Sequence, residues 1–146
     1  MSKWMLLVDD SADDVELTRL ALEENEIANT LVVASDGAEA IAMLSAESIA
    51  ERGGLPAVIL LDLNLPKVDG TEVLRHLRYD DRTRLVPVVI LTSSEEERDL
   101  VATYNLGANS YIRKPVDFSE FLAVMQHLGI YWLNLNRLPP ETHARI

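Results

Sequence analysis

Polar residues of three kinds, aspartate, threonine and lysine, follow apolar segments of this sequence, and together they suit chemistry on a phosphoryl group. These residues are Asp9-Asp10, Asp62, Thr92 and Lys114. A carboxylate can attack a phosphoryl donor and form an acyl phosphate, and this reaction depends mainly on positioning and on neutralising the charge of the phosphoryl oxygens. We expect Asp62 to be the nucleophile, Lys114 to contact a phosphoryl oxygen, and the Thr92 hydroxyl to turn toward an added phosphate.

The segments that must position these residues read as five βα units. The predicted strands are Trp4–Val8, Leu31–Ala34, Ala57–Leu61, Val86–Leu91 and Asn109–Ile112. Several of them are apolar without alternation, which is typical of strands covered by helices on both faces. The pattern predicts an α/β fold with a doubly wound parallel sheet. In such a sheet ligands bind at the carboxyl ends of the strands, which is where the polar residues fall.

Capping signals predict where the helices between these strands begin. Asp69, Ser94 and Asp117 each stand three residues before a glutamate, the spacing of a capping box. The segment Ala38–Arg52 has helical composition and is followed by Gly53-Gly54, so we expect one long helix there.

Any one of these polar residues could simply mark the start of a loop, but their convergence favours a metal site. Carboxylates close together raise one another's pKa unless a cation shares them. Because the ligands are oxygens, Mg²⁺ is favoured and Mn²⁺ is possible. We expect Asp10 to bind the metal directly, Asp9 to bind it directly or through water, Asp62 to share it, and the Asn64 main-chain carbonyl to complete the site.

Composition limits the other functions open to the chain. A formal charge of −11 over 146 residues disfavours direct binding of nucleic acid or anionic lipid. No apolar stretch reaches the roughly 18 residues that span a bilayer, and the chain has no cysteine. We expect a cytoplasmic protein with one domain over residues 1–136 and a flexible tail over residues 137–146.

The order and strand context of these residues resemble the bacterial response-regulator receiver family. The motifs are Asp9-Asp10, Asp62, Thr92-Ser93 and Lys114-Pro115, and the segment from Asp62 to Gly70 closely resembles the phosphoacceptor loop of that family. The resemblance covers about the first 128 residues. It implies a flavodoxin-like sheet of order 2-1-3-4-5.

The resemblance further implies that Asp62 accepts phosphate from the phosphohistidine of a sensor kinase and that Mg²⁺ is required. It implies a cis peptide between Lys114 and Pro115, a switch role for Tyr111 together with Thr92, and a homodimer through the fourth helix, fifth strand and fifth helix. The tail around Tyr131–Pro140 is similar to stand-alone regulators of cyanobacterial phytochrome kinases, so a phytochrome is the suggested partner.

Two other functions remain open at this stage. An aspartate-nucleophile phosphatase also uses Mg²⁺, but that mechanism needs an acid two residues after the nucleophile, where this chain has Asn64, and an amide cannot act as a general acid. A receiver-like module could instead bind partners without phosphorylation. We favour a signalling domain that catalyses only its own phosphorylation.

Overall fold

The computed structural model describes residues 3–24 and 31–140. Its five strands form one sheet in the order β2-β1-β3-β4-β5, and all neighbouring strands run parallel. The strands are β1 (Met5–Val8), β2 (Leu31–Ala34), β3 (Val58–Leu61), β4 (Val88–Thr92) and β5 (Ser110–Arg113). The predicted fold and strand order are therefore confirmed, and each predicted strand lies within two residues of the observed one.

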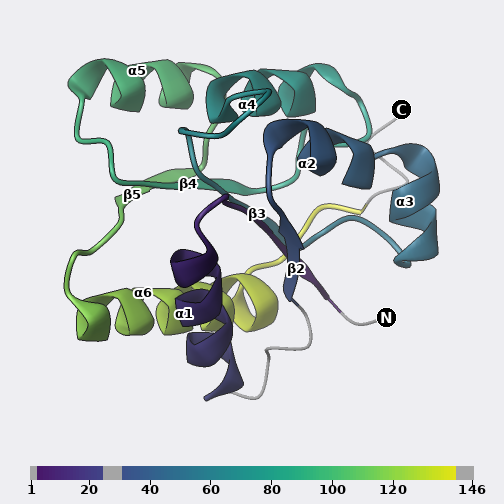
Figure 1. The fold of residues 1–146 in the computed structure, drawn as a ribbon. Coiled ribbons are helices and arrows are strands. Elements are labelled where there is room, and N and C mark those ends of the chain that lie inside the picture. The colour runs from purple at the N-terminus through teal and green to yellow at the C-terminus, as the bar shows by residue number, and fades with distance from the viewer. Residues whose placement is uncertain (1–2, 25–30, 141–146) are drawn as a thin grey trace.

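Helices cover both faces of this sheet (Figure 1). α2, α4 and α5 lie on one face, and α1 and α6 lie on the other. The helices are α1 (Ala12–Glu23), α2 (Gly37–Met43), α3 (Ala46–Glu51), α4 (Gly70–Tyr79), α5 (Glu97–Asn105) and α6 (Phe118–Ile130), and α6 continues into a π-helical segment, η2 (Tyr131–Leu135). Within the described residues, no helix is long and apolar enough to cross a bilayer.

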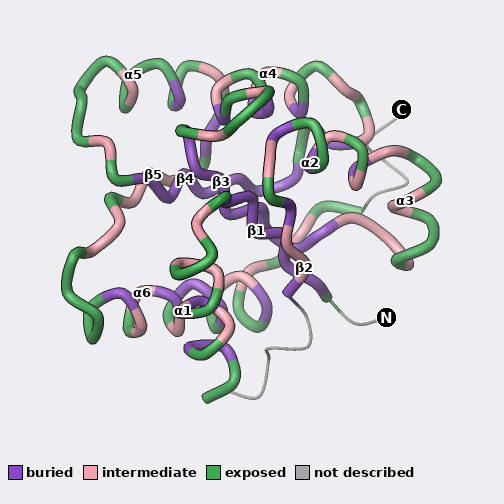
Figure 2. Tube along the Cα trace, in the orientation of Figure 1, coloured by how far each residue is buried: buried purple, intermediate pink, exposed green. Residues whose placement is uncertain are grey.

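The core consists of two apolar layers separated by the sheet. Residues alternate between the layers along each strand: Leu6 and Val8 of β1 pack in the layer that includes α4, whereas Met5 and Leu7 pack in the layer that includes α6. Figure 2 shows the buried residues concentrated on the strands and on the helix surfaces that face them. This burial holds the strands rigidly, so the residues that follow them are placed accurately.

Two of the three predicted helix starts are confirmed. The Asp69 and Asp117 side chains accept hydrogen bonds from the backbone N–H groups of Glu72 and Glu120, and α4 and α6 begin at the next residue after each cap. The prediction for Ser94 was wrong, because α5 begins only at Glu97. The Ser94 hydroxyl instead donates to an Asp99 carboxylate oxygen at 2.6 Å.

The single long helix predicted over Ala38–Arg52 was also wrong, because the chain forms two short helices there. α2 ends at Met43, and the Ser45 side chain then caps α3 by accepting a hydrogen bond from the Ser48 N–H. The Ser48 hydroxyl also donates to the Ala42 carbonyl at 3.3 Å. Serine hydroxyls that bond to nearby backbone in this way compete with a continuous helix.

The prediction of a flexible tail concerns residues 137–146, of which only 137–140 are described. In that part Leu138 is partly buried against the core layer that contains α6. The Lys3 ammonium donates to the Asn136 carbonyl at 3.4 Å. Within the described part of the tail, Leu138 therefore packs against the domain, and residues 141–146 lie outside the described residues.

Candidate functional site

Asp9 and Asp62 lie side by side because they follow neighbouring parallel strands. Val8 of β1 pairs with Leu61 of β3, and the Asp62 N–H donates to the Val8 carbonyl at 3.0 Å. Asp10 is exposed and completes a group of three carboxylates whose oxygens lie within 4.8 Å of one another. Three converging oxygen ligands fit a divalent cation such as Mg²⁺ or Mn²⁺. The predicted convergence of Asp9, Asp10 and Asp62 is thus present.

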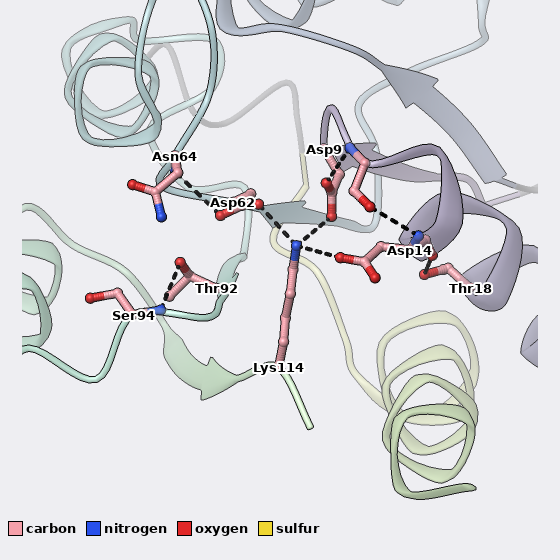
Figure 3. Close-up of polar contacts among 9 residues, drawn as sticks. Asp9, Asp14, Thr18, Asp62, Asn64, Thr92, Ser94 and Lys114 are labelled. Carbon is pink, nitrogen blue, oxygen red and sulfur yellow. Dashed lines mark hydrogen bonds and ion pairs between the residues drawn. The ribbon is translucent and has the colours of Figure 1, made fainter. Parts of the chain in front are cut away.

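Lys114 is the positive charge of this site (Figure 3). Its ammonium lies 2.9 Å from an Asp9 oxygen, 2.9 Å from an Asp62 oxygen and 2.8 Å from an Asp14 oxygen. The lysine side chain is only 11% exposed. Each of its three N–H groups can therefore point at a different carboxylate.

Burial and ion pairing act in opposite directions on the pKa values of this cluster. Burial raises the pKa of Asp9 above its usual value, although the hydrogen bond from Lys114 works against that rise. Burial alone would lower the pKa of Lys114, but its hydrogen bonds to Asp14, Asp9 and Asp62 raise it. The lysine is consequently charged throughout the physiological pH range, which suits a group that neutralises phosphoryl oxygens.

The loop after Asp62 is held close to the site by backbone contacts. The Asn64 N–H donates to an Asp62 carboxylate oxygen at 3.2 Å, and the Gly70 N–H donates to the Leu63 carbonyl at 2.9 Å. A β-carbon at Gly70 would lie 2.2 Å from the Asp62 carbonyl oxygen, so only glycine permits this approach. Asp10 and Asn64 line a depression of about 440 Å³ beside the acidic cluster.

Thr92 and Tyr111 are connected through the backbone of Ser94. The Thr92 hydroxyl oxygen accepts a hydrogen bond from the Ser94 N–H at 3.3 Å, and the Tyr111 hydroxyl donates to the Ser94 carbonyl at 3.1 Å. Thr92 is completely buried, and burial raises the pKa of Tyr111. From the sequence, Thr92 and Tyr111 were predicted to act together as a switch, whereas Ser94 was predicted only to cap a helix.

The predicted cis peptide between Lys114 and Pro115 was wrong, because no cis peptide occurs among residues 3–24 and 31–140. Trans is the intrinsically preferred isomer of an X–Pro bond. The Lys114 N–H donates to the Thr92 carbonyl at 2.7 Å, which continues the β4–β5 pairing by one residue. The lysine therefore reaches the carboxylates with a trans bond.

Sequence reasoning missed Asp14. It lies in the first turn of α1, and its backbone N–H donates to the side chain of the Ser11 cap at 3.3 Å. Side chains in a helix point back toward its N-terminus, so a carboxylate in this turn points toward the sheet edge from which the helix departs. The Ser11 cap three residues earlier was the signal that could have identified it.

Comparisons with known proteins agree with this geometry. The family model of the response regulator receiver domain matches residues 5–126. Response regulator Rcp1 of Synechocystis sp. (strain ATCC 27184 / PCC 6803 / Kazusa) is 37% identical over 137 residues, which cover 94% of this chain and 93% of that protein.

Two solved structures are also similar over nearly the whole chain. The phosphorylated cyanobacterial phytochrome response regulator RcpA superposes with a TM-score of 0.86 at 35% identity, covering 96% of this chain and 100% of that one. The Mn²⁺-bound form of response regulator Rcp1 superposes with a TM-score of 0.83 at 36% identity, covering 94% and 99%.

Proposed function

This chain belongs to the response regulator receiver domain family, and we propose that its Asp62 accepts a phosphoryl group from a partner histidine kinase. Receiver domains of this family are signalling domains of two-component systems that bind a divalent metal and work with such kinases. The observation that carries the proposal is the 2.9 Å contact between the Lys114 ammonium and an Asp62 oxygen inside the acidic cluster. A nucleophile, a cation-binding set and a fixed positive charge meet there.

In the proposed reaction, an Asp62 carboxylate oxygen forms a bond to phosphorus while the phosphorus–nitrogen bond of the kinase phosphohistidine breaks. The bonding electrons leave with the imidazole, which takes up a proton. Lys114 donates a hydrogen bond to a phosphoryl oxygen as it gives up its contact with Asp62. Asp9, Asp10, Asp62 and the Asn64 carbonyl would hold Mg²⁺, which supplies further neutralisation of negative charge.

The response to phosphorylation is proposed to pass through Thr92 and Tyr111. The Thr92 hydroxyl would turn toward the phosphoryl group and give up its hydrogen bond from the Ser94 N–H. The Tyr111 hydroxyl donates to the Ser94 carbonyl, so a shift of the Ser94 backbone would change the hydrogen bond that holds the tyrosine side chain. A bistable element of this kind converts a local charge change into a change of surface.

The proposed output is a change in binding, either between two copies of the chain or to a partner. The resemblance implied a dimer face on the fourth helix, the fifth strand and the fifth helix. Because the predicted second helix forms as two helices, α2 and α3, these elements are α5, β5 and α6 in the structure. Leu100, Val101 and Tyr104 on α5 are 37%, 53% and 48% exposed, and apolar residues gathered on one helix support a binding surface. A phytochrome kinase acting in the cytoplasm is the proposed phosphodonor, because RcpA is a phytochrome response regulator.

The test is intact-mass analysis after treatment with acetyl phosphate and Mg²⁺. The wild type should gain one phosphoryl group, and both Asp62→Asn and an EDTA-treated sample should gain none. Absence of a gain in folded wild type would favour a module that works without phosphorylation. Continuous release of inorganic phosphate from many donors would instead identify a phosphatase.

A further inference from the structure

We propose that Asp14 is a positioning residue that anchors Lys114 for phosphoryl transfer, a role that rests on the proposed function of Asp62. The Asp14 carboxylate lies 2.8 Å from the Lys114 ammonium, as close as the other two carboxylates. It comes from α1, whereas Asp9 and Asp62 come from strand ends. Asp14 thus connects the helix to the loop that carries the lysine (Figure 3).

Asp14 differs from the other two partners in what the reaction does to it. Asp9 and Asp62 belong to the group of carboxylates that can hold a cation, and Asp14 does not belong to that group. Asp62 also becomes the phosphorylated residue in the proposed reaction. Asp14 is therefore the partner that can keep its hydrogen bond to Lys114 before, during and after the transfer.

The anchor itself is fixed by its place in the helix. The Asp14 N–H bonds to the Ser11 cap, and the Asp14 carbonyl accepts a hydrogen bond from the Thr18 hydroxyl at 2.8 Å. The carboxylate is 24% exposed, so it is partly shielded from water. A lysine held at one N–H by a rigid acceptor has fewer ways to place its other N–H groups, which favours the orientation that the phosphoryl group needs.

The chain offers a matched control in Asp13. This carboxylate lies in the same first turn of α1 and is exposed. It is not among the carboxylates within 4.0 Å of the Lys114 ammonium. Asp13→Ala and Asp14→Ala therefore remove the same charge from the same helix end, and only the second removes the anchor.

The first measurement is the rate of mass gain with acetyl phosphate and Mg²⁺. We expect Asp14→Ala to react roughly three to ten times more slowly than Asp13→Ala, because a Lys114 ammonium held in the wrong place stabilises the transferred phosphoryl group less well. Asp14→Asn keeps an acceptor oxygen and should restore most of the rate. A rate for Asp14→Ala equal to or above that of Asp13→Ala would overturn the proposal, and so would a failure of Asp14→Asn to restore the rate.

The second measurement is nitrogen-15 NMR of the lysine ammonium groups, which needs no phosphorylation. The lysines of the chain are Lys3, Lys67 and Lys114, and Lys3 and Lys67 are exposed. A slowly exchanging ammonium signal should be present in the wild type, Asp13→Ala and Asp14→Asn, and should broaden in Asp14→Ala. An unchanged signal in Asp14→Ala would overturn the anchor.

The two proposals fail in different ways. If the wild type and Asp13→Ala gain no phosphate, the proposed function of Asp62 is wrong, and the NMR signal alone decides whether Asp14 holds Lys114. If both gain phosphate normally and Asp14→Ala matches them, the phosphoacceptor reading stands and the role of Asp14 is wrong.

Discussion

Two partly buried cations, Lys114 and Arg78, stabilise different regions of the molecule through different kinds of partner. Lys114 contacts three carboxylates at the carboxyl edge of the sheet. Arg78, on α4, donates to the Gly107 carbonyl at 2.8 Å, the Val86 carbonyl at 2.8 Å and the Asn109 side-chain oxygen at 3.1 Å. It thereby connects α4 to the segments before β4 and β5.

The pKa values of the two cations differ accordingly. The carboxylates raise the pKa of Lys114 despite its burial. Burial lowers the pKa of Arg78, and no ion pair within 4.0 Å offsets it in the described part of the chain. Carbonyl and amide oxygens do not titrate in the physiological pH range, so neither ionisation nor the proposed phosphoryl transfer changes the partners of Arg78, whereas both can change the partners of Lys114. This difference separates a structural cation from one suited to chemistry.

The largest expected effect is that of Lys114→Met without divalent metal. Three carboxylates would lose their shared ammonium, and leaving buried charges uncompensated should reduce the free energy of unfolding by about 3 kcal/mol. Because Asp9 and Asp62 belong to the cluster that can hold a cation, Mg²⁺ should restore most of the loss. Urea unfolding of the variant with EDTA and with Mg²⁺ measures both effects.

Arg78→Met should lower the free energy of unfolding by about 2 kcal/mol, because several carbonyl oxygens lose their donor. Mg²⁺ should not restore this loss, since no carboxylate pairs with this arginine in the described residues. The same urea titrations test it. If Mg²⁺ raised the free energy of unfolding of Lys114→Met and Arg78→Met by the same amount, the proposed difference between an exchangeable and a structural cation would be wrong.

Gly107→Ala tests how closely the backbone must approach Arg78. Gly107 has a φ of 98°, and an added β-carbon would lie 3.0 Å from the Arg78 Nε. We expect a loss of about 1 kcal/mol from the positive φ. Urea unfolding of Gly107→Ala, Arg78→Met and the double variant measures how much of the loss comes from crowding against Arg78. The glycine substitution should lower the free energy of unfolding less in the Arg78→Met background than in the wild type, because the guanidinium that the β-carbon crowds is then absent.

The smallest expected effect is that of Asn109→Asp, which gives Arg78 a carboxylate partner. The site is exposed, so the new ion pair should add only about 0.5 kcal/mol. An arginine partner depresses the pKa of an aspartate, so the added stability should be present above the pKa of the unfolded state and disappear as the pH falls. Urea midpoints at pH 7 and pH 3 measure it, and a constant difference from the wild type would contradict it.

The sheet could be predicted from the sequence because the apolar runs mark the strands and the polar residues after them mark where the strands end. Asp9 and Asp62 could be placed together because parallel strands end at one edge, and the structure puts their oxygens in one group with Asp10. Asp69 and Asp117 could be identified as caps because the backbone N–H groups that they bond to lie only three residues further along the chain.

The features that were predicted wrongly or missed depend on which of several available partners a polar side chain bonds to, and the composition of a segment does not show this. Ser45 caps a new helix instead of lying inside a longer one, and Ser94 pairs with Asp99 instead of capping α5 directly. Asp14 reaches Lys114 across 100 positions of the chain, a contact that requires the docking of α1. Local sequence therefore predicts elements better than it predicts which of two available partners a polar side chain takes.

Both tryptophans lie toward the opposite end of the strands from the carboxylate cluster. Trp4 precedes β1 while Asp9 follows it, so the strand separates them by roughly 16 Å. Trp132 lies in η2 and lines a surface depression with Ser110 at the start of β5, whereas Lys114 follows the end of that strand. Tryptophan fluorescence should therefore report unfolding and events on the α6–η2 surface, and a change in tryptophan emission on phosphorylation would be a signature of rearrangement or assembly far from Asp62.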